Sequence, residues 1–227
     1  MAIISRDRGY LFIQTPQTAC SAIAQKVLIP QLDGEDVLSR SIRNRRGWVV
    51  VDQKHCTLAQ ILDIGALDRD EAARLLKFSA VRNPFDAVVS EYAKRRTQFA
   101  PLVDRPSTWI HRRKRMVRNT RYAFDHSFNE WVRRVYRIPF PKSLIRGRVF
   151  VRGTPFQDGM DMVMRFEHLQ EDFNKVLGQL GIEPIEIPVF HTTEGRQRDY
   201  REYYTPETRR LIETAYRPLL DRFGYAF

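Results

Sequence analysis

The chain has 227 residues, which is long enough for one full hydrophobic core and short for two. Hydrophobic residues make up 43% of it, so its composition is not that of a disordered protein. The formal net charge of +11 is typical of a protein whose partner is anionic, such as a phosphate, a sulfate, an acidic sugar, nucleic acid or an anionic lipid.

The first part of the chain alternates short apolar runs with helical patterns. The run at 10–14 predicts a strand that ends at Pro16, because proline has no N–H to donate to a strand ladder. The run at 77–81 predicts a second strand, and Pro84 then suits the first turn of a helix. Another strand is expected at 47–51, and helices are expected at 18–29, 58–62 and 68–76.

The second part of the chain contains a strongly basic stretch. Between 105 and 124 there are seven Lys or Arg and no acidic residue, and we expect irregular structure there. This stretch either docks an acidic ligand or is a solvated, mobile loop. A strand is expected at 160–166, and helices are expected at 124–136, after 166 up to Gly181, and from Thr205 to 223 with a kink at Pro218.

Strands that alternate with helices predict an α/β fold with a central, mainly parallel sheet covered on both faces. The N-terminal residues 1–8 read as polar, and the apolar run after them is too short for a leader or a membrane span. Two cysteines, Cys20 and Cys56, make no disulfide framework. They are either two small buried residues or a redox pair. We therefore expect a soluble, cytoplasmic protein.

Two strand-to-helix junctions carry candidate functional groups. Residues 15–22 form a loop that feeds a helix, whose free N–H groups and positive dipole end suit an anion. Arg82 ends a predicted strand, and its guanidinium can donate two parallel bonds to a phosphate. Ser90 lies off the apolar stripe of the next helix. Taken singly, each segment also fits an ordinary turn, a surface arginine and a solvated serine.

Together these segments resemble the sulfotransferases that use 3′-phosphoadenosine 5′-phosphosulfate (PAPS), in particular the carbohydrate-type family and its bacterial members. Residues 16–22 are similar to that family's 5′-phosphosulfate loop, and Arg82 and Ser90 keep the spacing of its 3′-phosphate motif. Residues 55–57 are similar to its His-x-Thr segment, and 165–173 to its Arg-Phe-Glu-x-Leu…Asp-Phe stretch. The resemblance runs in order through nearly the whole chain and omits about 100–148.

The resemblance implies a three-layer, P-loop-like sulfotransferase fold in one domain, 1–227, with a basic insertion at about 97–148. It implies transfer of a sulfuryl group from PAPS to an acceptor hydroxyl, of a carbohydrate or another metabolite, with the nucleotide PAP as product and no metal. His55 is the candidate base, and it either takes the acceptor's proton or only caps the following helix. The donor-binding residues would be Gln17, Thr18, Ala19, Cys20, Ser21, Ala22, Arg82, Ser90, Arg196 and Arg198.

One position departs from the family pattern. Gln17 stands where the family has a lysine that neutralises charge on the leaving group, and Cys20 stands where it has a glycine. Gln17 remains our candidate catalytic donor, but its bond carries no charge and is weaker. Two alternatives therefore stay open: a catalytically impaired, PAPS- or PAP-binding relative with a regulatory role, and a basic nucleic-acid-binding protein, although no nucleic-acid-binding motif is visible.

Overall fold

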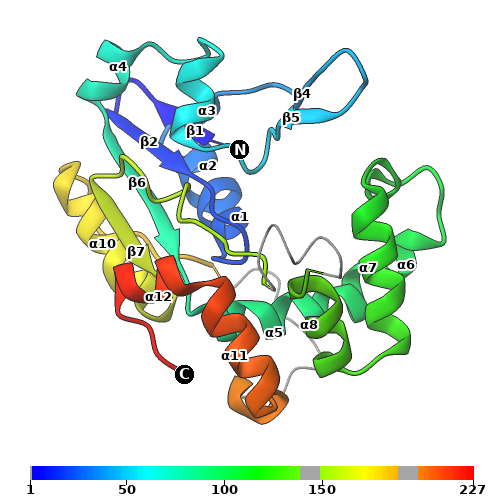
Figure 1. Ribbon diagram of the computed structural model, residues 1–227. Coiled ribbons are helices and arrows are strands. Elements are labelled where there is room, and N and C mark those ends of the chain that lie inside the picture. Colours follow the sequence, from blue (N-terminus) through cyan, green and yellow to red (C-terminus); the bar gives the residue numbers. More distant parts are fainter. Residues whose placement is uncertain (1, 139–148, 189–198) are drawn as a thin grey trace. The chain divides into compact units, whose positions relative to one another are not determined.

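The computed structural model describes residues 2–138, 149–188 and 199–227 (Figure 1). The chain divides into two compact units. Unit 1 consists of residues 1–82 and 154–191, and unit 2 consists of residues 83–153 and 192–227. The expected insertion at about 97–148 falls within unit 2. That the whole chain acts as one domain stays a prediction.

Unit 1 is built on a five-stranded sheet with the order β3-β1-β2-β6-β7. The pairs β2–β6 and β6–β7 are parallel, whereas β1 is antiparallel to both of its neighbours. Four of the five strands therefore run in the same direction, and the mostly parallel sheet is confirmed. The strands are β1 (Ala2–Ser5), β2 (Tyr10–Ile13), β3 (Glu35–Asp36), β6 (Leu76–Val81) and β7 (Met162–Arg165).

Strand side chains alternate between the two faces of the sheet, and here both faces are apolar. Helices therefore cover both of them. On one face the rings of Phe12 and Phe78 stack with centroids 4.9 Å apart, in a cluster shared with α1 and α10. On the other face Leu11 packs in a cluster with Ile61 of α3 and Ala72 of α4. The helices are α1 (Cys20–Ile23), α2 (Ile29–Gln31), α3 (Leu58–Asp63), α4 (Arg69–Arg74) and α10 (Leu169–Gln179).

A π-helical turn, Ala24–Leu28, joins α1 to α2 without a break, so the helical segment runs from Cys20 to Gln31. A short 3-10 helix, Phe166–His168, follows β7 directly. Unit 1 also contains a separate two-stranded sheet of β4 (Ile42–Arg43) and β5 (Val49–Val51).

The described part of unit 2 is mainly helical. The four segments α5, α8, α11 and the C-terminal residues enclose an aromatic core in which Phe85, Trp131 and Ile212 are fully buried. The elements are α5 (Pro84–Lys94), a π turn (Arg95–Phe99), α6 (Ala100–Val103), 3-10 turns (Trp109–Arg112 and Tyr200–Tyr203), α7 (Lys114–Asp125), α8 (Phe128–Tyr136), α11 (Pro206–Ala215) and α12 (Arg217–Phe223).

The structure corrects several predicted elements. Residues 1–8 are not simply polar, because β1 is fully buried between β2 and β3. The expected strand at 47–51 belongs to the small β4–β5 sheet and not to the central one. The basic stretch is not irregular, since α7 occupies 114–125. The next helix starts at Phe128, later than expected, because Ser127 and Glu130 form a capping box there.

The C-terminal helix also differs from the prediction. It does not bend at Pro218 within one helix but divides into α11 and α12 at Tyr216. Pro218 then lies in the first turn of α12, where its missing N–H removes no hydrogen bond. The predicted N-cap Thr205 is confirmed, with its side chain accepting from the N–H of Thr208.

Candidate active site

The carboxyl ends of three parallel strands meet at one edge of the unit 1 sheet. β2 pairs with β6 up to Ile13–Ser79, and β6 pairs with β7 up to Val81–Arg165. β2, β6 and β7 therefore end at the same edge of the sheet (Figure 1), and the residues that directly follow them are Gln14, Arg82 and Phe166. In parallel sheets this edge is where ligands bind.

The loop after β2 adopts a strained backbone without glycine. Gln17 has φ 67° and Ala19 has φ 55°, both in the left-handed region. For residues with a Cβ this costs about 1 to 2 kcal/mol each, and such strain is concentrated at functional sites. The hydroxyl of Thr18 donates to the carbonyl of Thr15 at 2.9 Å, which closes the loop on itself. The structure thus holds this loop in one shape.

The loop ends at the N-terminus of the helical segment that starts at Cys20. Ala19 occupies the N-cap position, so it offers no side-chain oxygen to the first N–H groups of the helix. An uncapped helix start is a favourable place for an anion, because the N–H groups and the helix dipole both attract negative charge.

Arg82 joins the second junction to this loop. Its side chain is buried, with 9% of the residue exposed, and its Nη1 donates to the carbonyl of Gln17 at 2.9 Å. Its guanidinium carbon lies 3.9 Å from the centroid of the Phe166 ring. A guanidinium has five N–H donors, so one group can hold the loop and also bind a phosphate. The sequence did not predict that Phe166 stacks on Arg82, because the two residues come together only through the pairing of β7 with β6.

His55 lies against the start of the same loop. Its Nδ1 is 3.0 Å from the carbonyl of Gln14, and because a carbonyl can only accept, Nδ1 carries the proton. The lone pair of Nε2 is then left to accept a proton. The alternative in which His55 only caps the next helix is wrong, because Thr57 and Gln60 form the capping box at the start of α3.

Burial lowers the pKa of His55 to about 4, although the bond to the Gln14 carbonyl opposes the shift. The imidazole is therefore neutral near pH 7. In the unfolded chain the pKa returns to its ordinary value of about 6.5. Above about pH 6.5 the histidine is neutral in both states, so it does not lower the free energy of unfolding. As the pH falls from about 6.5 toward 4, the unfolded state binds a proton that the native state does not, and the free energy of unfolding decreases.

We expect His55→Gln to remove this pH dependence. Between pH 7 and pH 4 the wild type should lose about 2 to 3 kcal/mol of unfolding free energy more than the variant, since the unfolded histidine binds a proton that the native one does not. Urea unfolding of both proteins at the two pH values measures the difference. Equal losses would contradict the buried, neutral His55.

Gln157 is a site residue that the sequence did not reveal. Only 2% of it is exposed, and its Nε2 donates to the carbonyl of Ala80 at 2.9 Å and to the hydroxyl of Thr15 at 3.3 Å. It therefore ties the loop after β2 to the end of β6. It follows no motif, and the contact spans 142 residues of chain, so no local pattern indicates it.

Gln157→Leu should destabilise the protein by about 1 to 3 kcal/mol, because the buried carbonyl of Ala80 loses its side-chain donor. Thermal and urea unfolding measure the change. Gln53→Leu, at a less buried glutamine of the same unit, is the control and should have a smaller effect. A Gln157 variant as stable as the wild type would show that the tie contributes nothing.

Buried polar atoms without a partner gather at this edge. Gln14 is completely buried, and within the described residues neither atom of its side-chain amide has a hydrogen-bond partner. The same holds there for Oε1 of Gln17 and Oγ of Ser79. Leaving a buried polar group unpaired costs about 1 to 3 kcal/mol, so a polar ligand or bound water is the expected partner.

The remaining predicted residues lie elsewhere. Ser90 is on α5 in unit 2 and is 1% exposed, so it is not a solvated serine. Arg196 and Arg198 fall outside the described residues. Cys20 and Cys56 are buried thiols that form no disulfide and belong to the clusters on opposite faces of the sheet. That placement favours two small buried residues over a redox pair.

The model of the sulfotransferase family matches residues 3–226, nearly the entire chain. The chain belongs to the sulfotransferase family. The searches of curated proteins and of solved structures found no match. The sulfotransferase has the mixed α/β architecture, with helices on a mostly parallel sheet, that is compatible with this membership.

A sulfotransferase requires a sulfate donor, and the groups at the sheet edge fit an anionic one. The uncapped helix start at Cys20, the Arg82 guanidinium and the unpaired Gln14 amide are all donors of the kind that phosphate and sulfate oxygens accept. In the part of the chain that is described, no group of three or more His, Cys, Asp or Glu is arranged to hold a metal ion. None of the described helices is long and apolar enough to cross a membrane.

Proposed function

We propose that this sulfotransferase transfers a sulfuryl group from PAPS to a hydroxyl of a carbohydrate or another metabolite. The observation that carries the proposal is the hydrogen bond from Arg82, which follows β6, to the carbonyl of Gln17 in the loop after β2. It brings a guanidinium to the loop before an uncapped helix start. This combination suits a ligand with several phosphate and sulfate oxygens. The fold would then be the three-layer, P-loop-like one.

The donor would bind through both junctions. Backbone N–H groups of residues 17–22 and the hydroxyl of Ser21 would hold the 5′-phosphosulfate, and Arg82 would bind the 3′-phosphate. Ser90, Arg196 and Arg198 are assigned to the donor by the family resemblance. PAPS supplies the activated sulfuryl group, and the chain's own residues position and neutralise it.

His55 would act on the acceptor. Its neutral imidazole, with the proton on Nδ1, presents Nε2 to take the hydroxyl proton as the acceptor oxygen attacks. The Gln14 carbonyl fixes this tautomer. A base with a pKa near 4 is always available at neutral pH but accepts a proton weakly, so its contribution to the rate should be at the lower end of the usual range.

The test is calorimetric titration with PAP, with adenosine 5′-monophosphate as the comparison. We expect a Kd in the micromolar range for PAP and much weaker binding of the nucleotide without a 3′-phosphate. PAPS incubated with a panel of hydroxyl acceptors should then release PAP. Failure to bind PAP would remove the proposed donor.

Gln17 favours a second candidate, a PAPS- or PAP-binding relative with impaired catalysis. Gln17 carries no charge, and its buried Oε1 has no partner within the described residues.

Under the transferase proposal, Gln17→Lys should raise turnover about 10-fold, because a charged donor stabilises the leaving group better than a neutral one. PAP release from PAPS measures the change, with Gln17→Met as an uncharged control.

The outcome of Gln17→Lys separates the two candidates. Turnover in the wild type that increases in the lysine variant supports the transferase. PAP binding without turnover in either protein would establish the impaired relative instead.

A further inference from the structure

A cavity of about 610 Å³ lies in unit 2, and arginines dominate its lining. Arg115 and Arg118 come from α7, Arg133 and Arg134 come from α8, and Arg137 is the residue that directly follows α8. We call this cavity the arginine pocket. Among the described residues that line it, none is acidic. The predicted donor-site residues that the structure describes do not contribute to it.

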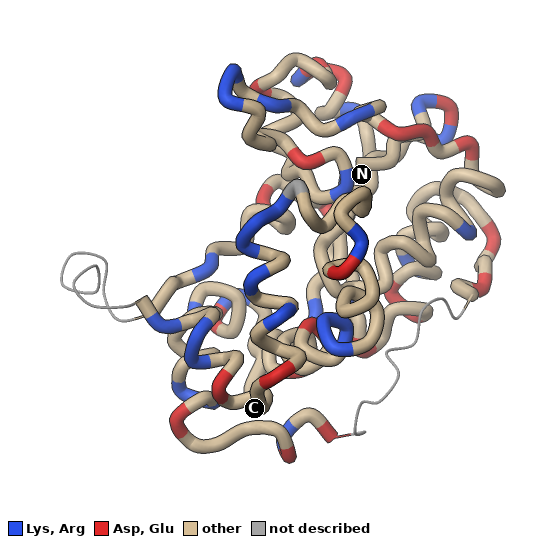
Figure 2. Tube along the Cα trace, turned by 90° about the vertical axis from the view of Figure 1, so that its right-hand side faces the viewer, with Lys and Arg blue, Asp and Glu red and all other residues tan. Residues whose placement is uncertain are grey.

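The arginines converge because of helical spacing. Arg115 and Arg118 are three residues apart on α7 and share a helix face, while Arg133 and Arg134 lie in the last turn of α8 and Arg137 directly follows it. The two helices contact one another. In Figure 2 all described Lys and Arg residues of the chain are blue and all described Asp and Glu residues are red.

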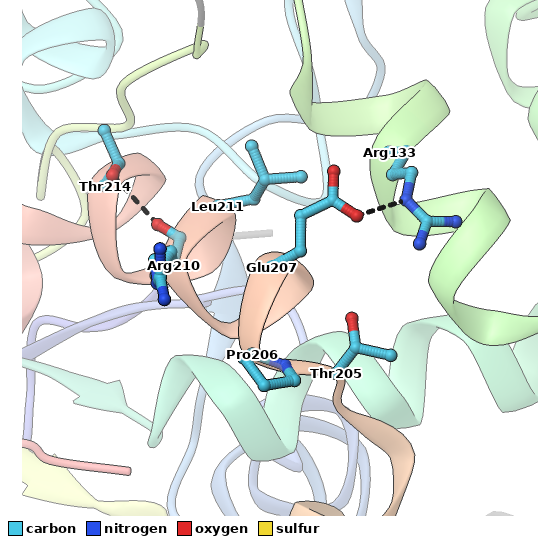
Figure 3. Close-up of a pocket in the computed structure, with 7 residues that line it drawn as sticks. All are labelled: Arg133, Thr205, Pro206, Glu207, Arg210, Leu211 and Thr214. Atoms are coloured by element: carbon cyan, nitrogen blue, oxygen red, sulfur yellow. Dashed lines mark hydrogen bonds and ion pairs between the residues drawn. The ribbon is translucent and has the colours of Figure 1, made fainter.

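Only part of this charge is neutralised within the protein. Glu207 of α11 binds Arg133, with Oε2 2.8 Å from Nε, and also binds Arg137. Figure 3 shows Glu207 reaching toward Arg133 beside a second cavity of about 550 Å³. Glu130, the acidic residue of α8, instead accepts hydrogen bonds from the backbone N–H and the hydroxyl of Ser127 at the start of the helix.

Three arginines of the pocket lack an acidic partner within the described ranges. Arg115 and Arg118 have no ion pair there. Arg134 lies over the ring of Tyr122, 4.4 Å from its centroid, which fixes the guanidinium without cancelling its charge. Charges of one sign around a cavity raise the local concentration of an oppositely charged ligand.

The position of Arg115 is unfavourable for α7 itself. Lys114 and Arg115 occupy the first turn of the helix, which contains no acidic residue. The positive end of the helix dipole lies there and disfavours cations. Helix stability therefore does not explain these residues, whereas an anion in the pocket would be attracted by both the side chains and the helix terminus.

We propose that the arginine pocket is a second anion-binding site, which takes a compact ligand with at least two sulfate, phosphate or carboxylate groups. Guanidinium groups suit such ligands because each can donate two parallel hydrogen bonds to one oxyanion. The volume admits a ligand of one or two sugar units. The site lies in unit 2 and uses none of the described residues that are proposed to bind the donor.

Calorimetric titration with sucrose octasulfate and with inositol hexakisphosphate tests the proposal, since the first probe carries sulfates and the second phosphates. Sucrose and inositol are the uncharged controls. We expect one charged probe molecule per chain and no binding of the uncharged sugars. The charged probe that binds more tightly identifies the preferred group.

The variant Arg115→Glu with Arg118→Glu should weaken probe binding about 10-fold or more. The matched control is Arg45→Glu with Arg46→Glu on the exposed turn between β4 and β5, which changes the net charge equally. The pocket variant should keep its thermal stability, because Arg115 lies in the first turn of α7, where an acidic residue is favourable, and Arg118 is exposed. It should also keep its affinity for PAP.

Equal weakening by both double variants, or several probe molecules per chain, would overturn the proposal in favour of diffuse surface charge. A 20-nucleotide single strand of DNA that binds far more tightly than either probe would also overturn it, because the pocket would then be part of an extended nucleic-acid track.

Discussion

Arg82→Ala should weaken PAP binding about 100-fold, corresponding to the loss of about 3 kcal/mol of charge-assisted hydrogen bonding. The variant loses the guanidinium and also its bond to the Gln17 carbonyl, so the loop after β2 loses a support. Calorimetry with PAP measures the effect, and the thermal midpoint shows whether the fold survives.

Two controls make this result interpretable. Arg74→Ala removes an exposed arginine at the end of α4 and should leave PAP affinity unchanged. Arg82→Lys keeps the charge but not the planar fork, so it should recover only part of the affinity. Undiminished PAP binding in a folded Arg82→Ala protein would contradict the proposed donor site.

His55→Gln should lower turnover of PAPS by about 100-fold while PAP affinity stays within a factor of about two, since general-base catalysis contributes to the rate and not to donor binding. Glutamine can still donate a hydrogen bond to the Gln14 carbonyl, but it cannot accept a proton. The release of PAP in the presence of an active acceptor measures turnover.

The pH profile distinguishes a base from a positioning residue. Because burial lowers the pKa of His55 to about 4, its contribution to wild-type turnover should be constant above about pH 5 and decline as the pH falls through 4. A His55→Gln enzyme with unchanged turnover, or a wild-type profile controlled by a group that titrates near pH 6.5, would contradict this role.

The elements that the sequence predicted well depend on local signals. Pro16 and Pro84 mark the ends of the apolar runs that form β2 and β6, so both junctions were found. The ends of neighbouring parallel strands lie at one edge of a sheet, which is why Arg82 and the loop after β2 lie together.

The elements that the sequence did not predict depend on contacts far apart in the chain. β1 has only four residues and is stabilised by pairing with β2 and β3. Phe166 contacts Arg82 only because β7 pairs with β6. α7 is rich in arginine, and its inner face is confined to small residues such as Thr120 and Ala123, which gave a weak helical pattern.

Hydrogen–deuterium exchange with and without PAP locates the donor-binding residues without any substitution and so tests the proposed donor site. We expect slower exchange in peptides that cover residues 14–22 and 80–82 of unit 1, and little change along α7. If PAP leaves those peptides unprotected, or protects only the arginine pocket, the proposed donor site is wrong.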